Sequence, residues 1–521
     1  MQRYPEIRYL RRVVARTFLK NFFWLQALNW LIKPIWILWI ERTVQVKLGN
    51  EWYGQYFVHF NLGLLFSVLL DAGLNAYISK EVASNGRFVH FKRVLKLRLG
   101  LGSLYIIAVA IFSWLQNLNS ILIFWVITNQ ILASVTLFIR SVLQGKHQFF
   151  KDSVLSITDR FVAIILCSYW LINADDFFGF EGIIYFLLSQ FAGYIVAILL
   201  GLTFLIFSKS GLEKIEDFYV ENNTLELRPW LKQVGWFVLM ALFMSFFTRF
   251  DALLIRSFSP TLNFYFGEEP GFFQAGIYAQ GYRLLDAALI FSLLMSTQLL
   301  PIFTKKITQR ESNNELLWGV FRLILLVGLS VLLFSITHGK QILFMMYGSK
   351  WLGSISLGAY SYQVFIFLMI SFIPMAMIHI FGTYVTAEDK LKFLTYSALI
   401  ALVVNIGLNL VLIPKFGALG AAYSSVFTQL LFLGFCISKT IKSNYFTWKK
   451  DYSIKLTAIL LGFLLFSVPL VLKTYVLLYI PDSYNSDLLN SQFVINTIFL
   501  AGLAGTLYWV EIKRLIFKTN K

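Results

Sequence analysis

Apolar segments of about twenty residues recur along almost the whole chain, and they constrain the fold more than any other feature. A helix needs about 20 consecutive apolar residues to cross the hydrocarbon core of a bilayer. Fourteen such segments can be placed, at 18–41, 52–79, 95–115, 119–141, 153–173, 181–207, 232–257, 272–303, 315–337, 355–384, 392–413, 417–438, 453–475 and 489–511. The longest connection, 208–231, is too short for a separate catalytic domain. The pattern predicts an all-α polytopic membrane protein with about 14 transmembrane helices.

The composition agrees with this reading. Of the 521 residues, 58% are hydrophobic and 14% are charged, whereas soluble domains have roughly 45–50% apolar and about 25% charged residues. Such a chain needs lipid as part of its solvent, so the formal net charge of +18 must lie outside the hydrocarbon. Nucleic-acid binding would need a basic face on a soluble domain. No segment is long enough to form one, and we expect no nucleic-acid partner.

The basic residues predict the orientation, because cytoplasmic loops of membrane proteins carry an excess of Lys and Arg. With the amino terminus inside, 34 of the 45 Lys and Arg residues fall on the inner side and 6 on the outer side. The first apolar run is longer than the 7–15 residues or so of a signal-peptide core, so we expect an uncleaved first span. The pattern favours an even number of spans with both termini in the cytoplasm.

Cysteine and histidine give no sign of a metal or redox site. Cys167 and Cys436 both fall inside apolar segments, where they are expected as small buried hydrophobes. The five His residues are scattered through separate segments without ligand spacing. We therefore expect no metal and no cofactor.

Two halves of the chain share short motifs, which predicts an internal repeat. Many transporters are built from repeats that enclose a site at the membrane midplane. The paired motifs are Leu48–Glu51 with Phe266–Glu269, Leu70–Ala72 with Leu285–Ala287, and Gly179–Tyr185 with Gly417–Tyr423. The alternative is that small residues simply mark the ends of spans.

A repeat of this kind would pair spans 1–6 with spans 7–12 in parallel and leave two helices over. It predicts a first six-helix bundle at 1–230, a second at 231–445, and two accessory helices with a cytoplasmic tail at 446–521.

Three stretches carry a resemblance to a known family: Leu48–Gly54, Gly73–Ala83 and Asn405–Gln429. They resemble the polysaccharide-export flippases of the O-antigen type, within the multidrug, oligosaccharidyl-lipid and polysaccharide exporter superfamily. The last stretch looks like the family's connection from span 11 to span 12. The resemblance implies two helical bundles around a central cavity, and alternating access.

The resemblance further implies a monomeric, non-enzymatic flippase in the bacterial cytoplasmic membrane. It would move a polyprenyl-pyrophosphate-linked oligosaccharide from the inner to the outer leaflet, for surface polysaccharide biosynthesis. Its partners would be this lipid-linked oligosaccharide, membrane lipid, and a coupling proton or sodium ion.

Two other functions stay open. A multidrug cation antiporter of the same superfamily is expected to show unpaired acids in its cavity. An integral-membrane glycosyltransferase or polymerase would need acidic or His groups on a sizeable outer loop. The outer loops do offer acids, but in short segments: Asp175, Asp176, Glu268 and Glu269.

We assign eight ionisable residues to the membrane interior. A charge at the bilayer centre costs about 2.5–3.5 kcal/mol on insertion scales, so such residues are candidates for function. They are Lys33, Asp71, Arg249, Asp251, Arg256, Arg283, Asp286 and Arg322. Arg256 and Arg322 lie near span ends, where a long side chain can reach the headgroups. Asp71 lies near the inner end of its span, where it can cap a helix or form a local ion pair.

Lys33, Arg249 and Arg283 each lie several residues from either end of their spans. Spans 1 and 7 are equivalent in the expected repeat, and the resemblance implies that both face the cavity. We therefore predict that these three cations bind the substrate. The alternative for Arg283 is an ion pair with Asp286, three residues further on the same helix face.

Three acids, Asp71, Asp251 and Asp286, are candidates for ion coupling or for a structural role. Pro34 and Pro374 lie inside expected spans and predict kinks, because proline removes a backbone hydrogen bond.

Overall fold

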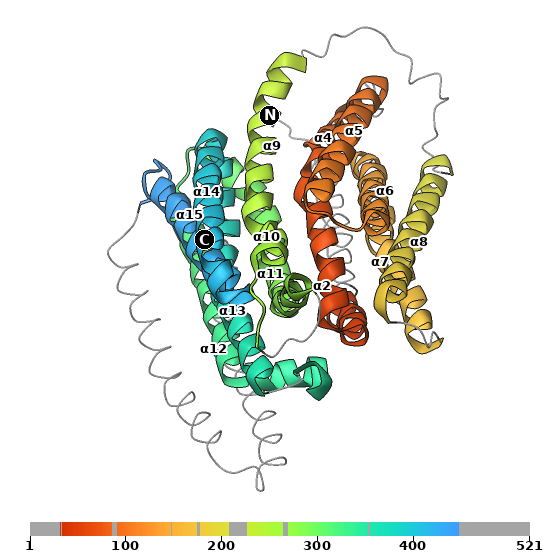
Figure 1. Ribbon diagram of the computed structural model, residues 1–521. Helices are drawn as coiled ribbons and strands as arrows, with labels where there is room; N and C mark the ends of the chain where they lie inside the picture. The colour runs from red at the N-terminus through yellow and green to blue at the C-terminus, as the bar shows by residue number, and fades with distance from the viewer. Residues whose placement is uncertain are drawn as a thin grey trace, which may run out of the picture. The chain divides into compact units, whose positions relative to one another are not determined.

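The protein is all-helical in the part of the chain that the structure describes. The computed structural model describes residues 32, 34–85, 91–146, 148–173, 178–207, 227–263, 269–352 and 355–447. Every regular element in these ranges is a helix (Figure 1). The predicted all-α class is confirmed.

The contacts divide the chain into two units, with the boundary between Ser257 and Phe258. The first unit contains η1 (Trp36–Glu41), α2 (Arg42–Phe66), α3 (Val68–Asp71), α4 (Leu74–Asn85), α5 (Phe91–Leu115), α6 (Ser120–Gly145), α7 (Phe149–Asn173), α8 (Gly179–Ile206), α9 (Leu227–Arg249) and α10 (Asp251–Phe258). The second contains α11 (Pro270–Thr308), α12 (Asn314–Leu352), α13 (Ile355–Ala387), α14 (Leu391–Phe416) and α15 (Ala418–Ile441).

Within the described ranges, nine helices are long and apolar enough to cross a membrane, and the bent pair α9–α10 makes a tenth when it is counted as one span. These ten match the expected spans from 95–115 to 417–438. The expected spans at 453–475 and 489–511, and most of the first span, lie outside the described residues. The chain is therefore a multi-pass membrane protein, and the total of fourteen spans stays a prediction.

Large apolar side chains are exposed on several of the described helices. Trp114 on α5 is 77% exposed and Ile172 on α7 is 81% exposed. Exposed apolar surface on this scale needs a covering partner, and in a chain of this hydropathy that partner is lipid.

The first two expected spans have different ends in the structure. Helix continues through Arg42, where the apolar run stops, as far as Leu48, and it breaks at Gly49 with φ 79°. A positive φ is readily adopted by glycine, which has no Cβ. The expected single span 52–79 is interrupted at Ala72 and Gly73, whose φ values are 44° and 77°. Neither break is visible in hydropathy, because both depend on backbone conformation.

The helices of each unit pack around small residues. In the first unit α7 packs against α8, and a Cβ added to Gly193 would lie 2.3 Å from the carbonyl oxygen of Asp159. In the second unit α11 packs on α13, where Gly281 faces Phe365 and Leu368. These close approaches fix pairs of helices side by side.

α9 contacts α2 and α3, and it therefore groups with the first unit. The predicted division into bundles at 230 and 445 stays a prediction.

α8 and α15 each have a glycine with a positive φ at their start. Gly179, at the start of α8, has φ 61°, and Gly417, just before α15, has φ 59°. These are the two glycines that open the paired motifs of the expected repeat. Both φ values are positive, and the repeat itself stays a prediction.

Candidate functional site

Two of the three predicted substrate-binding cations lie in the described residues, and Lys33 lies outside them. Arg249 is the last residue of α9. α10 starts at Asp251, which is buried, and the two helices are bent by 40°. Broken helices at membrane depth occur where the backbone is covered by protein or lines a cavity. The break places a cation and an acid at one bend of this span.

Arg283 is buried on α11 and forms an ion pair with Asp286. Arg283 Nη1 lies 3.7 Å from Asp286 Oδ2, and the two side chains are 10% and 22% exposed. The pairing that the sequence left open as an alternative is therefore present. Arg249 belongs to the first unit and Arg283 to the second, so their convergence on one cavity stays a prediction.

Asp71 has a local role at the beginning of α4. Its Oδ1 accepts a hydrogen bond of 3.0 Å from the backbone N–H of Asn75. A carboxylate that satisfies a free N–H at a helix start stabilises that helix. Arg98 lies within electrostatic range of Asp71 and also donates to Asn75 Oδ1, at 3.3 Å. These contacts give Asp71 a structural role at the start of α4, and a coupling role stays a prediction.

Arg256 and Arg322 both contact groups within the protein. Arg256 donates to the carbonyl oxygen of Gln116 at the end of α5, and Ser257 Oγ donates to Gln116 Oε1 at 2.6 Å. Arg322 lies over the ring of Trp318, 5.7 Å from its centroid. Arg256 therefore ties the end of α10 to the connection between α5 and α6.

A polar cluster in the first unit was missed by sequence reasoning. It consists of Trp36, Glu41, Tyr53, Asp159, Arg160 and Tyr194, and we call it the Glu41–Arg160 cluster. The Arg160 guanidinium lies over the Trp36 ring, 4.9 Å from its centroid. Its Nε is 3.7 Å from Asp159 Oδ2, and its Nη2 is 3.5 Å from the Tyr194 hydroxyl. The hydroxyl of Tyr53 donates to Glu41 Oε1 at 3.0 Å.

The expected bounds of two spans explain why Arg160 and Glu41 are not among the predicted site residues. Arg160 is one of the 34 basic residues that the sequence assigns to the inner side, although it lies well inside α7 and inside the expected span 153–173. Glu41 stood at the expected end of span 1, whereas the helix continues beyond it to Leu48. The adjacent Asp159 and Arg160 in an otherwise apolar run are the signal that could have found the cluster.

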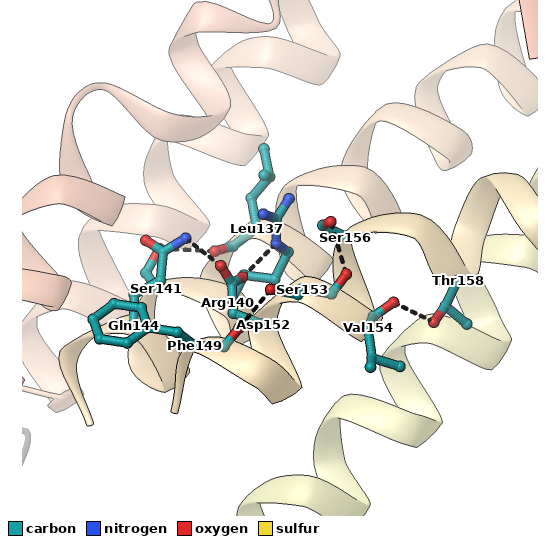
Figure 2. Close-up of polar contacts among 10 residues, drawn as sticks. All are labelled: Leu137, Arg140, Ser141, Gln144, Phe149, Asp152, Ser153, Val154, Ser156 and Thr158. Atoms are coloured by element: carbon teal, nitrogen blue, oxygen red, sulfur yellow. Dashed lines mark hydrogen bonds and ion pairs between the residues drawn. The ribbon is translucent and has the colours of Figure 1, made fainter. Parts of the chain in front are cut away.

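A second polar contact joins α6 to α7 near the turn between them (Figure 2). Arg140 Nε lies 2.7 Å from Asp152 Oδ1, and Gln144 Nε2 donates to Asp152 Oδ2 at 2.9 Å. The Asp152 side chain is only 2% exposed. Both carboxylate oxygens are thus bound, which is the condition for keeping a charge buried. This arrangement joins the two helices within the first unit.

The charged and polar groups of these helices can bind ions and polar ligands. In the described ranges no group of three or more His, Cys, Asp or Glu residues could hold a metal ion. Cys167 and Cys436 are both buried, one in each unit, with free thiols. Cations, acids and aromatic rings inside membrane helices suit the recognition of charged or polar cargo and of ions.

Comparison with known proteins places this arrangement in a family and a fold. A sequence model described as polysaccharide biosynthesis protein matches residues 18–307. No curated protein sequence matches the chain.

Two solved structures share the fold. One is an inward-facing multidrug resistance MATE family transporter of the MOP superfamily, with a TM-score of 0.58, 14% identity, and coverage of 78% of this chain and 94% of that chain. Another is the lipid II flippase MurJ in an inward closed conformation, with a TM-score of 0.57, 13% identity, and coverage of 95% and 99%. The chain has the fold of these transporters.

Proposed function

The chain belongs to the polysaccharide biosynthesis protein family, and on that premise we propose that it is a flippase for a polyprenyl-pyrophosphate-linked oligosaccharide. It moves this cargo from the inner to the outer leaflet of the bacterial cytoplasmic membrane by alternating access, for surface polysaccharide biosynthesis. The proposal is for a monomeric transporter, not an enzyme, with both termini in the cytoplasm.

The observation that carries the proposal is the family match over 18–307. This range contains all three predicted cavity cations, Lys33, Arg249 and Arg283. The fold shared with the lipid II flippase, at 13% identity, supports the architecture alone.

The charges suit an anionic headgroup. A lipid-linked oligosaccharide carries its negative charge on a pyrophosphate, and the planar fork of arginine matches phosphate oxygens with two parallel hydrogen bonds. Arg249 stands at the bend between α9 and α10, where a span is interrupted. We assign it a phosphate contact, because it is the cation that stands at this interruption.

A multidrug cation antiporter is the second candidate. It would use acids inside the described membrane helices, such as the buried Asp251 and Glu41. Such a transporter would bind organic cations and leave lipid-linked oligosaccharide in place. Competition between the two cargo classes for the purified protein separates these functions.

The test uses the sign of the cargo's charge. Moving one elementary charge across 100 mV is worth about 2.3 kcal/mol, so a headgroup with roughly two negative charges is driven outward by about 4.6 kcal/mol in a membrane that is negative inside. Fixed arginines do not cancel this, because they do not travel with the cargo.

The experiment follows flipping in proteoliposomes that contain the lipid-linked oligosaccharide. A potassium-diffusion potential is imposed with valinomycin and then collapsed by matching potassium on both sides. We expect flipping to slow when the potential collapses. An unchanged rate at fixed pH and sodium would mean that little net charge moves, which argues for an uncharged cargo or electroneutral exchange. Absence of flipping under every condition would refute the proposed function.

A further inference from the structure

The start of α14 and the end of α15 lie side by side in the second unit. The two helices pack against each other, and only Gly417 separates them in the chain, so they form an antiparallel hairpin (Figure 1). The Nζ atom of Lys439, near the end of α15, lies 5.3 Å from the centroid of the Phe393 ring, near the start of α14. The distribution of basic residues predicts that this end of the α14–α15 hairpin faces the cytoplasm.

Four lysines from the two helices gather at this end. Lys390 occupies the N-cap position of α14, and Lys392 lies in its first turn. Lys439 lies in the last turn of α15, and Lys442 occupies its C-cap position. Lys390, Lys392 and Lys442 are exposed, and Lys439 is partly buried. An ammonium group has three N–H donors, so contact with a ring still lets Lys439 donate to an anion.

The acids of the same segments offset only part of this charge. Ser443 Oγ donates to Glu388 Oε1, and Asp389 is exposed. Within 388–392 and 439–442, four lysines and two acids leave an excess of two positive charges. The end of the hairpin is therefore attractive to an anion.

Both helices expose apolar side chains beyond the lysines. On α14, Tyr396, Ile400 and Val403 are exposed. They follow Lys392 at intervals of three and four residues, which places them on one helix face. On α15, Phe427 and Leu430 are exposed in the same way. Each helix thus carries an apolar strip that begins near the lysines.

The length of the strip suits one leaflet of a bilayer. From Lys392 to Val403 an α-helix rises by about 16 Å. This is about half of the roughly 30 Å hydrocarbon core. A ligand that fits this surface has an anionic head beside the lysines and apolar chains along the strip.

We propose that this end of the α14–α15 hairpin is a binding surface for an anionic phospholipid of the inner leaflet. Its phosphate lies at the lysines, and its acyl chains lie on the apolar strips. Clusters of basic residues on the cytoplasmic side of membrane helices attract anionic headgroups. Lysine is a compact point charge that binds phosphate without the planar geometry of arginine. The surface concerns membrane lipid, so it is independent of the proposed cargo.

The experiment compares two lipids with the same acyl chains. The full-length protein, purified in detergent, is titrated with phosphatidylglycerol or phosphatidylcholine, and bound lipid is counted by native mass spectrometry. Phosphatidylglycerol should bind more tightly, and its binding should weaken as the ionic strength rises. Equal binding of the two lipids overturns the proposal.

Two double variants remove the lysines of one helix at a time. Lys390→Gln/Lys392→Gln and Lys439→Gln/Lys442→Gln should each weaken phosphatidylglycerol binding by about fivefold for each lysine. Phosphatidylcholine binding should not change. Unchanged phosphatidylglycerol binding in both variants overturns the proposal.

Lys340→Gln/Lys415→Gln is the matched control. It removes the same charge at two exposed lysines that the sequence places on the outer side. Its affinity for phosphatidylglycerol should equal that of the unsubstituted protein. An equal loss in the control would show that only the net charge of the protein matters, which overturns the site.

Competition and crosslinking identify the occupant and its position. Phosphatidylglycerol with a photoreactive acyl chain should label peptides of α14 and α15, and labelling elsewhere alone overturns the proposal. Inorganic phosphate at constant ionic strength should not displace the lipid. Displacement would make this a site for a free anion. Displacement by lipid-linked oligosaccharide at a lower concentration than by phosphatidylglycerol would make it a cargo surface and overturn the assignment to phospholipid.

Discussion

Arg283 lies one helical turn before Asp286 on α11, with 3.7 Å between Nη1 and Oδ2. The pair has no net charge, and its carboxylate is the more exposed member. A ligand that approaches this face of α11 therefore meets an acid as well as a guanidinium. Arg249, the other described cation that the sequence suggests for substrate binding, stands instead at the bend between α9 and α10.

Removing Arg283 alone should harm the protein more than removing the whole pair. Arg283→Ala leaves Asp286 without its guanidinium partner inside the membrane, which is costly. The double variant Arg283→Ala/Asp286→Ala removes both charges and should recover membrane insertion and thermal stability. Stability in detergent measures this. If the double variant is the less stable of the two, the ion pair is not what holds Arg283.

Arg249→Ala should abolish export of surface polysaccharide while the protein remains inserted. Arg249→Lys keeps the charge but not the planar fork, so it should retain partial activity if charge alone matters and little if two phosphate oxygens are bound together. Surface polysaccharide at equal protein level is the readout. Full activity of Arg249→Ala would refute its role in the cavity.

The orientation can be checked with reporter fusions. Fusions near residues 90, 145, 220, 308, 445 and 518 should report cytoplasm, and a fusion near 265 should report the outside, because the basic residues gather in the former segments. The fusion near 518 is the most informative, since two expected spans precede it outside the described residues. An outside signal there would refute fourteen spans.

Asp152→Ala should destabilise the first unit. The substitution leaves Arg140 and Gln144 without their acceptor, and breaking a buried pair costs about 3–5 kcal/mol, with the lower end expected here because Arg140 is partly exposed. The midpoint of thermal unfolding should fall clearly. Glu181→Gln, an exposed carboxyl change in the same unit, serves as the control. Equal midpoints for both variants would show that the contact in Figure 2 contributes little.

Gly417→Ala should destabilise the second unit. A Cβ there would lie 1.7 Å from Gln274 Oε1, the atom that accepts from the backbone N–H of Ala418 and from the hydroxyl of Tyr360. The positive φ costs about 1–2 kcal/mol for alanine, and the overlap adds about 1–3 kcal/mol.

Gly434→Ala is the matched control for Gly417→Ala, because nothing lies within 4 Å of its added Cβ and it stands inside α15. Its thermal midpoint should not fall. A similar loss in both variants would show that any glycine replacement in this region is harmful and that the left-handed conformation is not the cause.

The membrane helices could be predicted from the sequence because their length and hydropathy are local properties. Ten expected spans correspond to apolar helices or to the bent pair. The breaks could not be predicted in the same way. Ala72 adopts a left-handed conformation beside the cap that Asp71 provides, and this depends on contacts that hydropathy does not record.

The candidate site, too, could be predicted only in part from the sequence. The pair of Arg283 with Asp286 could be anticipated, because three residues on one helix bring two side chains to the same face. The Glu41–Arg160 cluster could not, since its members come from η1, α2, α7 and α8 and meet only after these helices pack. Proximity of this kind is a property of the tertiary structure.

The π-helical segment η1, at Trp36–Glu41, also changes which residues of the first described helix lie on the same face. An α-helix has 3.6 residues per turn, whereas an i→i+5 turn holds more. A helical wheel drawn through 34–48 with a single period would therefore assign Trp36 and Leu48 to wrong relative faces. A scan of substitutions that selects one face of this helix by spacing has to be divided at Glu41, with a separate wheel on each side.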